Sequence, residues 1–179
     1  MLTIHHITTA SEYYSFVENL LESAFPKEEC RDKKLQRECT DNNPKFKCNL
    51  IQTTYGQPIG VITRWDFGDF IYIEHFAIDP TLRSQGYGSE ALKAFIHEHG
   101  KPLVLEAEPP TDALSIRRIK FYERIGLTLY DFPYMQPAYT EDSHPVELRL
   151  MGTLDTNATP LPLVSQILHR EVYGWTAND

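Results

Sequence analysis

The chain has 179 residues, 41% of them hydrophobic, and a formal net charge of −8; its length and apolar content favour one globular domain with a real core. The acidic balance argues against general nucleic-acid binding, which needs a basic surface, and is compatible with a cationic substrate. No apolar run approaches the about 20 residues of a membrane span, and the first residues lack the basic segment of a signal peptide, so we expect a soluble, cytoplasmic protein.

The first half of the chain alternates between strand-like and helix-like patterns. We predict strands over residues 2–8, 46–55, 59–65 and 70–78, and helices over 11–24 and 26–38. Ser11 is a suitable cap for the first helix, and Pro26 ends it and begins the second. The strand 70–78 is apolar on both faces, which is typical of a central strand covered on both sides.

The second half has a longer period. We predict helices over 86–99, from 111 or 112 to 125, and 163–173, with strands over 103–107, 127–130 and 146–151. Antiparallel hairpins followed by helical crossovers predict an α+β, or mixed α/β, domain with a mixed sheet. We place this domain at residues 1–152 and a C-terminal tail at 153–179.

Three cysteines, Cys30, Cys39 and Cys48, are the chain's only thiols. Their odd number and wide spacing do not resemble a zinc site, which usually contains close pairs such as C-x-x-C. We therefore predict free thiols and no metal.

The segment Arg83-Ser84-Gln85-Gly86-Tyr87-Gly88 follows a predicted strand and opens a predicted helix. Glycines allow a backbone to approach a ligand closely, and the first amides of a helix lack intrahelical acceptors, so a phosphate or pyrophosphate fits there. The Rossmann fingerprint fails because its third glycine is absent, and the P-loop fails because Gly-Lys-Ser/Thr is absent.

The wider context resembles the Gcn5-related N-acetyltransferase (GNAT) family. The segment from Ile73 to Gly88 is similar to that family's central motif, Arg/Gln-x-x-Gly-x-Gly/Ala, and Phe121-Tyr122-Glu123-Arg124-Ile125-Gly126-Leu127 is similar to its Phe-Tyr-x-x-x-Gly-Phe segment. The resemblance implies a mostly antiparallel, mixed central sheet flanked by helices. It also implies an N-acetyltransferase that uses acetyl-CoA.

The resemblance implies that acetyl-CoA lies where two parallel strands, 70–78 and 103–107, splay apart. Its pantetheine arm would pair with the main chain of Phe76, Ala77 and Ile78, although the side chains of Phe76 and Ile78 also suit plain core packing. Its pyrophosphate would be held by the amides of Arg83, Ser84, Gln85, Gly86, Tyr87, Gly88 and Ser89. Ser115 stands where the family commonly has an asparagine that touches the cofactor, and it and Phe121 are further candidate contacts.

Acyl transfer to an amine requires two proton movements. The resemblance makes Tyr122 the candidate general acid for the leaving thiolate; the alternative is a helix tyrosine that only packs. Glu74, a carboxylate in an otherwise apolar strand, is the candidate base, or it only orients substrate or water. His75 is adjacent but is expected to face the opposite side of the sheet.

The resemblance implies that the N-terminal helices and the segment 131–139 form the acceptor site. Aromatic and proline residues of this segment, among them Tyr134 and Tyr139, are expected to line it, and Glu141 and Asp142 to attract an amine. The competing interpretations are a packed loop or a homodimer contact. The predicted acceptor is a small-molecule or peptidyl amine. A regulatory module that binds acyl-CoA without turnover, and an interaction protein without CoA binding, are the alternative functions.

Overall fold

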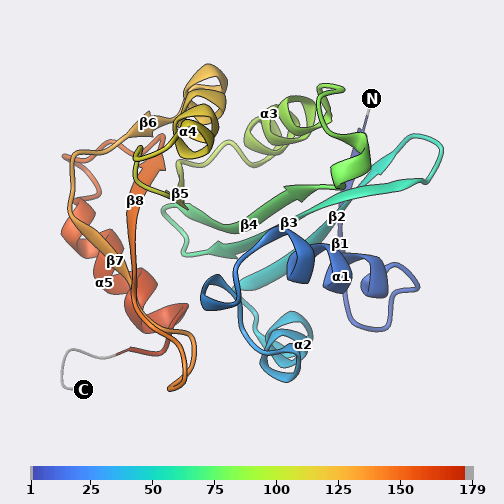
Figure 1. Ribbon diagram of the computed structural model, residues 1–179, viewed down its shortest axis with the longest axis horizontal. Coiled ribbons are helices and arrows are strands. Elements are labelled where there is room, and N and C mark those ends of the chain that lie inside the picture. The colour runs from blue at the N-terminus through green and yellow to red at the C-terminus, as the bar shows by residue number, and fades with distance from the viewer. Residues whose placement is uncertain (1, 176–179) are drawn as a thin grey trace. The chain divides into compact units, whose positions relative to one another are not determined.

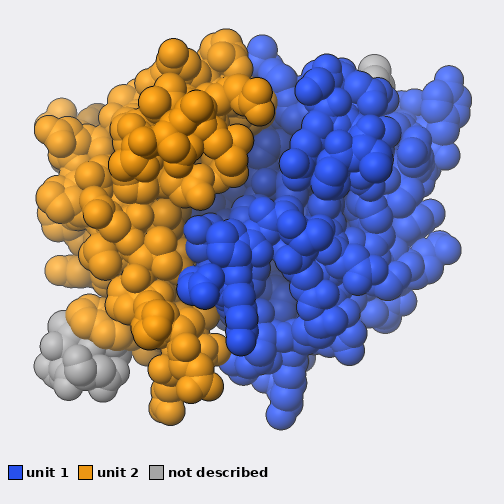
Figure 2. All heavy atoms as spheres, viewed as in Figure 1, with its two compact units in different colours: residues 1–103 blue, residues 104–179 orange. Residues whose placement is uncertain are grey.

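The protein is described by a computed structural model of residues 2–175, whose contacts divide the chain into two compact units, residues 1–103 and 104–179 (Figure 2). Both units combine helices with antiparallel strands, which confirms the predicted α+β class. None of the helices in the described part of the chain is long and apolar enough to cross a membrane. The domain boundary expected near residue 152 stays a prediction.

The first unit contains four antiparallel strands in the order β1-β2-β3-β4 (Figure 1). Their bounds are Leu2–Ile7, Phe46–Thr53, Pro58–Asp66 and Ile71–Ile78. Helix α3 (Tyr87–His99) covers one face of this sheet, and α1 (Tyr14–Ala24) and α2 (Lys33–Asn42) cover the other (Figure 1). Because β4 is covered on both sides, its apolar residues are buried along almost its whole length, as the sequence predicts.

Helix α1 places a narrow apolar stripe on the sheet. Its buried residues recur three or four positions apart, which is the spacing of one helix face: Tyr14, Val17, Leu20 and Leu21. The adjoining segment differs from the sequence prediction. A continuous helix over 26–38 is wrong, because a 3-10 turn, η1 (Lys27–Glu29), is followed by three non-helical residues before α2 begins. Asp32 is extended and accepts a hydrogen bond from the Leu35 amide, so it is the N-cap that starts a separate helix.

The second unit is arranged around β8 (Val146–Gly152) (Figure 1). Three strands pair antiparallel with it: β5 (Leu103–Ala107), β6 (Thr128–Leu129) and β7 (Tyr134–Gln136). Strand β7 falls inside the segment that was expected only as an aromatic wall, so the sequence prediction missed it. Its partners in β8 are Val146, Glu147 and Leu148.

Two helices complete this unit. Helix α4 (Ala113–Ile125) begins at a capping box in which the Asp112 carboxylate accepts hydrogen bonds from two backbone amides, and it ends at Gly126 in the left-handed conformation. Helix α5 (Leu161–Glu171) has Pro160 as its N-cap and buries Val164 and Leu168 completely. The C-terminal helix predicted from the sequence is therefore present and packed.

Candidate functional site

The loop before α3 has the backbone of an anion site. Ser84 and Gly86 both have positive φ, 65° and 85°. Gly86 is the N-cap of α3, and no side chain caps its amides. No atom lies within 4 Å of where a Gly86 Cβ would stand, so glycine is favoured there by the left-handed conformation and not by crowding.

The amides of the first turn of α3 are available to a ligand. The first hydrogen bond closed by the helix runs from the Glu90 amide to the Gly86 carbonyl, so the amides of the three residues between them have no intrahelical acceptor. Residues 83–86 are exposed, and the Arg83 side chain is tied to the end of β4 through a hydrogen bond from Nε to the Ile78 carbonyl, 3.3 Å. These groups fit a pyrophosphate, since they combine several N–H donors, the positive end of a helix dipole and a guanidinium.

The end of β4 is held against β3 by a close backbone contact. Gly60 is paired with Ile78, and a Cβ at residue 60 would lie only 2.5 Å from the carbonyl oxygen of Ala77. Ala77 and Ile78 are buried and Phe76 is half-buried. The side chains of Ala77 and Ile78 therefore pack in the core, and a cofactor contact at these two residues would have to use the main chain.

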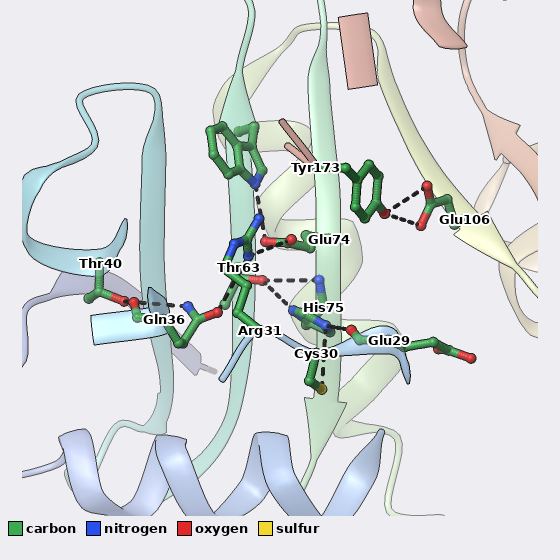
Figure 3. A network of polar contacts seen from close by, with 11 residues as sticks. Glu29, Cys30, Arg31, Gln36, Thr40, Thr63, Glu74, His75, Glu106 and Tyr173 are labelled. Atoms are coloured by element: carbon green, nitrogen blue, oxygen red, sulfur yellow. Dashed lines mark hydrogen bonds and ion pairs between the residues drawn. The ribbon is translucent and has the colours of Figure 1, made fainter. Parts of the chain in front are cut away.

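Glu74 is held in a buried network (Figure 3). Its carboxylate lies 2.6 Å from an Arg31 nitrogen and accepts a hydrogen bond from the indole nitrogen of Trp65, 3.1 Å. The side chain of Glu74 is 0% exposed and that of Arg31 is 8% exposed. The Arg31 guanidinium also lies over the rings of Trp65 and Phe46. The predicted base is thus paired with a cation supplied by the segment between η1 and α2.

His75 lies on the same side as Glu74, so the expectation that it faces the opposite side is wrong. The pairing of β3 with β4 shifts between Thr63, which faces His75, and Arg64, which faces Ile73, and Glu74 is the extra residue of this bulge. A bulge interrupts the alternation of side chains, which a sequence pattern does not reveal. The Glu74 side chain is fully buried, but the residue as a whole is half-buried. The exposed atoms of Glu74 are therefore main-chain atoms.

His75 has a structural environment. Its Nδ1 accepts a hydrogen bond from the Thr63 hydroxyl, 3.2 Å, and its Nε2 donates to the Glu29 carbonyl, 2.8 Å (Figure 3). Burial lowers the pKa of His75 below its usual 6.5, so the ring is neutral at pH 7. Both ring nitrogens are committed, which leaves this histidine without a role in proton transfer.

The three cysteines are free thiols, as predicted. Burial raises the pKa of each to about 12, so none is an activated nucleophile. Among the described residues there is no group of three or more metal-binding side chains.

Helix α4 presents the predicted acid and two predicted cofactor contacts. The Tyr122 ring is 8% exposed and packs edge-on against Phe121, 5.3 Å between centroids. Its hydroxyl makes no hydrogen bond to another residue in the described part of the second unit, and burial raises its pKa to about 12. Ser115 is buried, and its hydroxyl accepts from the Asp112 amide and donates to the Asp112 carbonyl. Its immediate function is helix capping, and its cofactor contact stays a prediction.

One residue of the predicted acceptor wall, Tyr134, contacts a carboxylate that the sequence analysis missed. Tyr134 donates a hydrogen bond to Glu106 of β5, 2.5 Å. Tyr173 donates to both Glu106 oxygens, at 2.9 and 2.8 Å (Figure 3). The Tyr139 ring packs against Tyr173, 4.8 Å between centroids. The signal that singled out Glu74, an acidic residue inside an apolar strand, also applies to Glu106 and could have found it.

Comparison with known proteins agrees with this architecture. The sequence pattern of the acetyltransferase (GNAT) family matches residues 13–127, more than half of the chain. A GNAT-family protein from Bacteroides thetaiotaomicron is 39% identical, with a TM-score of 0.92 over 97% of this chain and 99% of that one. Among curated proteins, none matches.

Two more distant structures share the fold alone. Spermidine N-acetyltransferase from Vibrio cholerae, solved with CoA and spermine, is 10% identical, with a TM-score of 0.64 over 87% of this chain and 96% of that one. A GNAT acetyltransferase from Elizabethkingia anophelis, solved with acetyl-CoA, is 16% identical, with a TM-score of 0.56 over 85% of this chain and 97% of that one.

Proposed function

Because this chain belongs to the acetyltransferase (GNAT) family, we propose that it transfers the acetyl group of acetyl-CoA to a primary amine of a small molecule or peptide, by direct attack in a ternary complex. The observation that carries the proposal is the uncapped N-terminus of α3 behind the left-handed residues Ser84 and Gly86. The two distant relatives that contain CoA or acetyl-CoA support the choice of cofactor.

The chain's own groups suit each part of that cofactor. The amides of residues 83–89 and the Arg83 guanidinium would hold the pyrophosphate, and the main chain of residues 76–78 would hold the pantetheine arm. Ser115 and Phe121 remain proposed contacts. When bound, acetyl-CoA supplies a thioester carbon that a neutral amine can attack.

Two carboxylates are candidates to take the proton that the acceptor ammonium must lose. Proton uptake by Glu74 would break its buried ion pair with Arg31, which is costly. The surroundings of Glu74 therefore favour a structural role, in which it holds the segment that contains Arg31 against β4. Glu106 is half-buried, and its identified partners include two neutral hydroxyls. We therefore place proton acceptance at Glu106 and positioning at Glu74.

Tyr122 is the proposed proton donor to the leaving thiolate. Its hydroxyl is not used by neighbouring groups of its own unit, and its raised pKa keeps it protonated at neutral pH. Tyr134 and Tyr139 belong to the proposed acceptor wall.

Calorimetric titration with acetyl-CoA, followed by a thiol-release assay over a panel of primary amines, tests the function. We expect saturable binding and amine-dependent release of CoA. Absence of binding at about 1 mM acetyl-CoA would contradict the proposal. Binding without release for every amine would contradict the catalytic step alone.

A further inference from the structure

Tyr173 lies two residues beyond α5, in a part of the chain outside the residues that match the family pattern. It nevertheless contacts Glu106, which lies 67 positions earlier in β5. Its hydroxyl reaches both carboxylate oxygens, at 2.9 and 2.8 Å (Figure 3). The C-terminal segment therefore takes part in holding a charged side chain and does not simply cover the unit.

Packing and a hydrogen bond hold helix α5 in position, and Tyr173 follows this helix in the chain. Val164 and Leu168 are fully buried, and His169 donates a hydrogen bond through Nε2 to the Met135 carbonyl of β7, 2.9 Å. The His169 ring also packs against Tyr134, 5.5 Å between centroids. Helix α5 and β7 are thus joined beside the two tyrosines that hold Glu106.

The Tyr134 hydroxyl is a reliable donor to this carboxylate. Tyr134 is 3% exposed, and burial together with the negative charge of Glu106 raises the pKa of its phenol well above 10. It stays protonated at any working pH. An ionised carboxylate accepts hydrogen bonds and cannot donate them, so two phenolic donors favour a negative charge at Glu106.

The surroundings of that charge suit an organic cation. Tyr139 and Tyr173 are half-buried with tilted rings 4.8 Å apart, and Glu106 is also half-buried. Aromatic faces attract cations, and most strongly where water is partly excluded. A carboxylate bordered by tyrosine rings combines charge and apolar contact for an ammonium group attached to an apolar body.

On the basis of the proposed function, we propose that Glu106, held by Tyr134 and Tyr173, with Tyr139 packed against Tyr173, binds the ammonium group of the acceptor. The acceptor class is then a primary amine carried on an aromatic or apolar group. Tyr173 is a positioning residue, since it acts through Glu106, and the C-terminal segment contributes to acceptor recognition.

Calorimetric titration of the full chain, saturated with CoA to prevent turnover, tests this assignment. The probes are phenethylamine and its neutral counterpart 2-phenylethanol. We expect Glu106→Gln to weaken phenethylamine binding by about tenfold or more, and Tyr173→Phe by several-fold, with the weak binding of 2-phenylethanol changed less than about twofold. Glu147→Gln and Tyr55→Phe are matched controls on exposed positions and should leave phenethylamine binding unchanged.

The outcomes separate this inference from the proposed function. Failure of CoA to bind contradicts the proposed function. If CoA binds normally, two results would overturn the inference. One is a wild-type protein that does not prefer phenethylamine to 2-phenylethanol. The other is that Glu106→Gln and Tyr173→Phe both retain that preference. Thermal unfolding of each variant identifies any that is misfolded, and Tyr173→Phe keeps the test decisive if Glu106→Gln does not fold.

Discussion

The guanidinium of Arg31 and the carboxylate of Glu74 form an ion pair of 2.6 Å in which both side chains are almost completely buried. The pair joins the segment between η1 and α2 to the bulge of β4. Its consequences can be measured independently of activity.

Arg31→Ala should lower the free energy of unfolding by about 3–5 kcal/mol, because it leaves a buried carboxylate without its guanidinium partner. Urea denaturation gives the value. Lys33→Ala, which removes the partner of Glu22 in an exposed pair, is the control and should leave stability nearly unchanged. Similar stability of the two variants would show that the buried pair is not important for folding.

Glu74→Gln and Glu106→Gln should have different kinetic effects. We expect Glu106→Gln to lower kcat with the best amine by about a hundredfold, because it removes the proposed proton acceptor. Glu74→Gln should mainly lower the melting temperature, since it disrupts the Arg31 pair. Steady-state kinetics and thermal unfolding of both variants check this, and the reverse ranking of kcat would return the role of base to Glu74.

Tyr122→Phe should lower kcat by about tenfold or more while acetyl-CoA binding is unchanged, because only the proton donor is removed. An unaltered kcat would leave Tyr122 as a packing residue.

The same variant should change stability at high pH. The pKa of Tyr122 is raised from 10 to about 12 on folding. The contribution of the protonated phenol to the free energy of unfolding is therefore fully present below pH 10, and it is lost as the pH rises through about 12. Denaturation at a series of pH values should show a smaller alkaline loss for Tyr122→Phe than for wild type.

Gly60→Ala should destabilise the first unit by about 1–3 kcal/mol, because its Cβ would press against the Ala77 carbonyl. We also expect a higher KM for acetyl-CoA, since that carbonyl belongs to the main chain proposed to hold the pantetheine arm. Gly56→Asn is the control, because residue 56 is open and asparagine tolerates its φ of 80°. Equal behaviour of the two variants would argue against a tight contact at Gly60.

Gly86→Ala should weaken acetyl-CoA binding by about tenfold, while Gly86→Asn should retain most of it. The position has space for a side chain but a φ of 85°, which alanine adopts only with strain. Titration calorimetry with acetyl-CoA on the two variants distinguishes the effect of backbone strain from that of steric crowding. Equal losses of affinity would mean that any side chain at residue 86 blocks the loop.

Much of the fold could be predicted because its signals are local. The strand 70–78 is apolar on both faces, and the helix that follows begins at glycines and ends at Gly100. The prediction of one helix over 26–38 is wrong because the charged composition of this segment does not reveal that Asp32 is extended and caps a new helix. Strand β7 was missed because three residues are too few to show an alternating pattern.

The site was predictable in part for the same reason. The loop 83–88 and Tyr122 belong to contiguous motifs, whereas the partnership of Arg31 with Glu74 joins residues 43 positions apart. The bulge at Glu74 and the contact of Tyr173 with Glu106 depend on register and on tertiary packing, which no local pattern encodes. Glu106, like Glu74, is a charged residue inside an apolar strand, so its position could have been found from the sequence, although its partners could not.

The partial burial of Cys30 and Cys39 and the full burial of Cys48 affect how turnover can be observed. At pH 8 a thiol with a pKa near 12 is ionised in only about one molecule in ten thousand, whereas an unperturbed thiol, with a pKa of about 8.5, is ionised in about one in four. A colorimetric reagent that reacts with thiolates should therefore register CoA as it is released and react slowly with the folded protein. Amine panels can then be screened continuously with the unmodified chain, without replacing Cys30, Cys39 or Cys48.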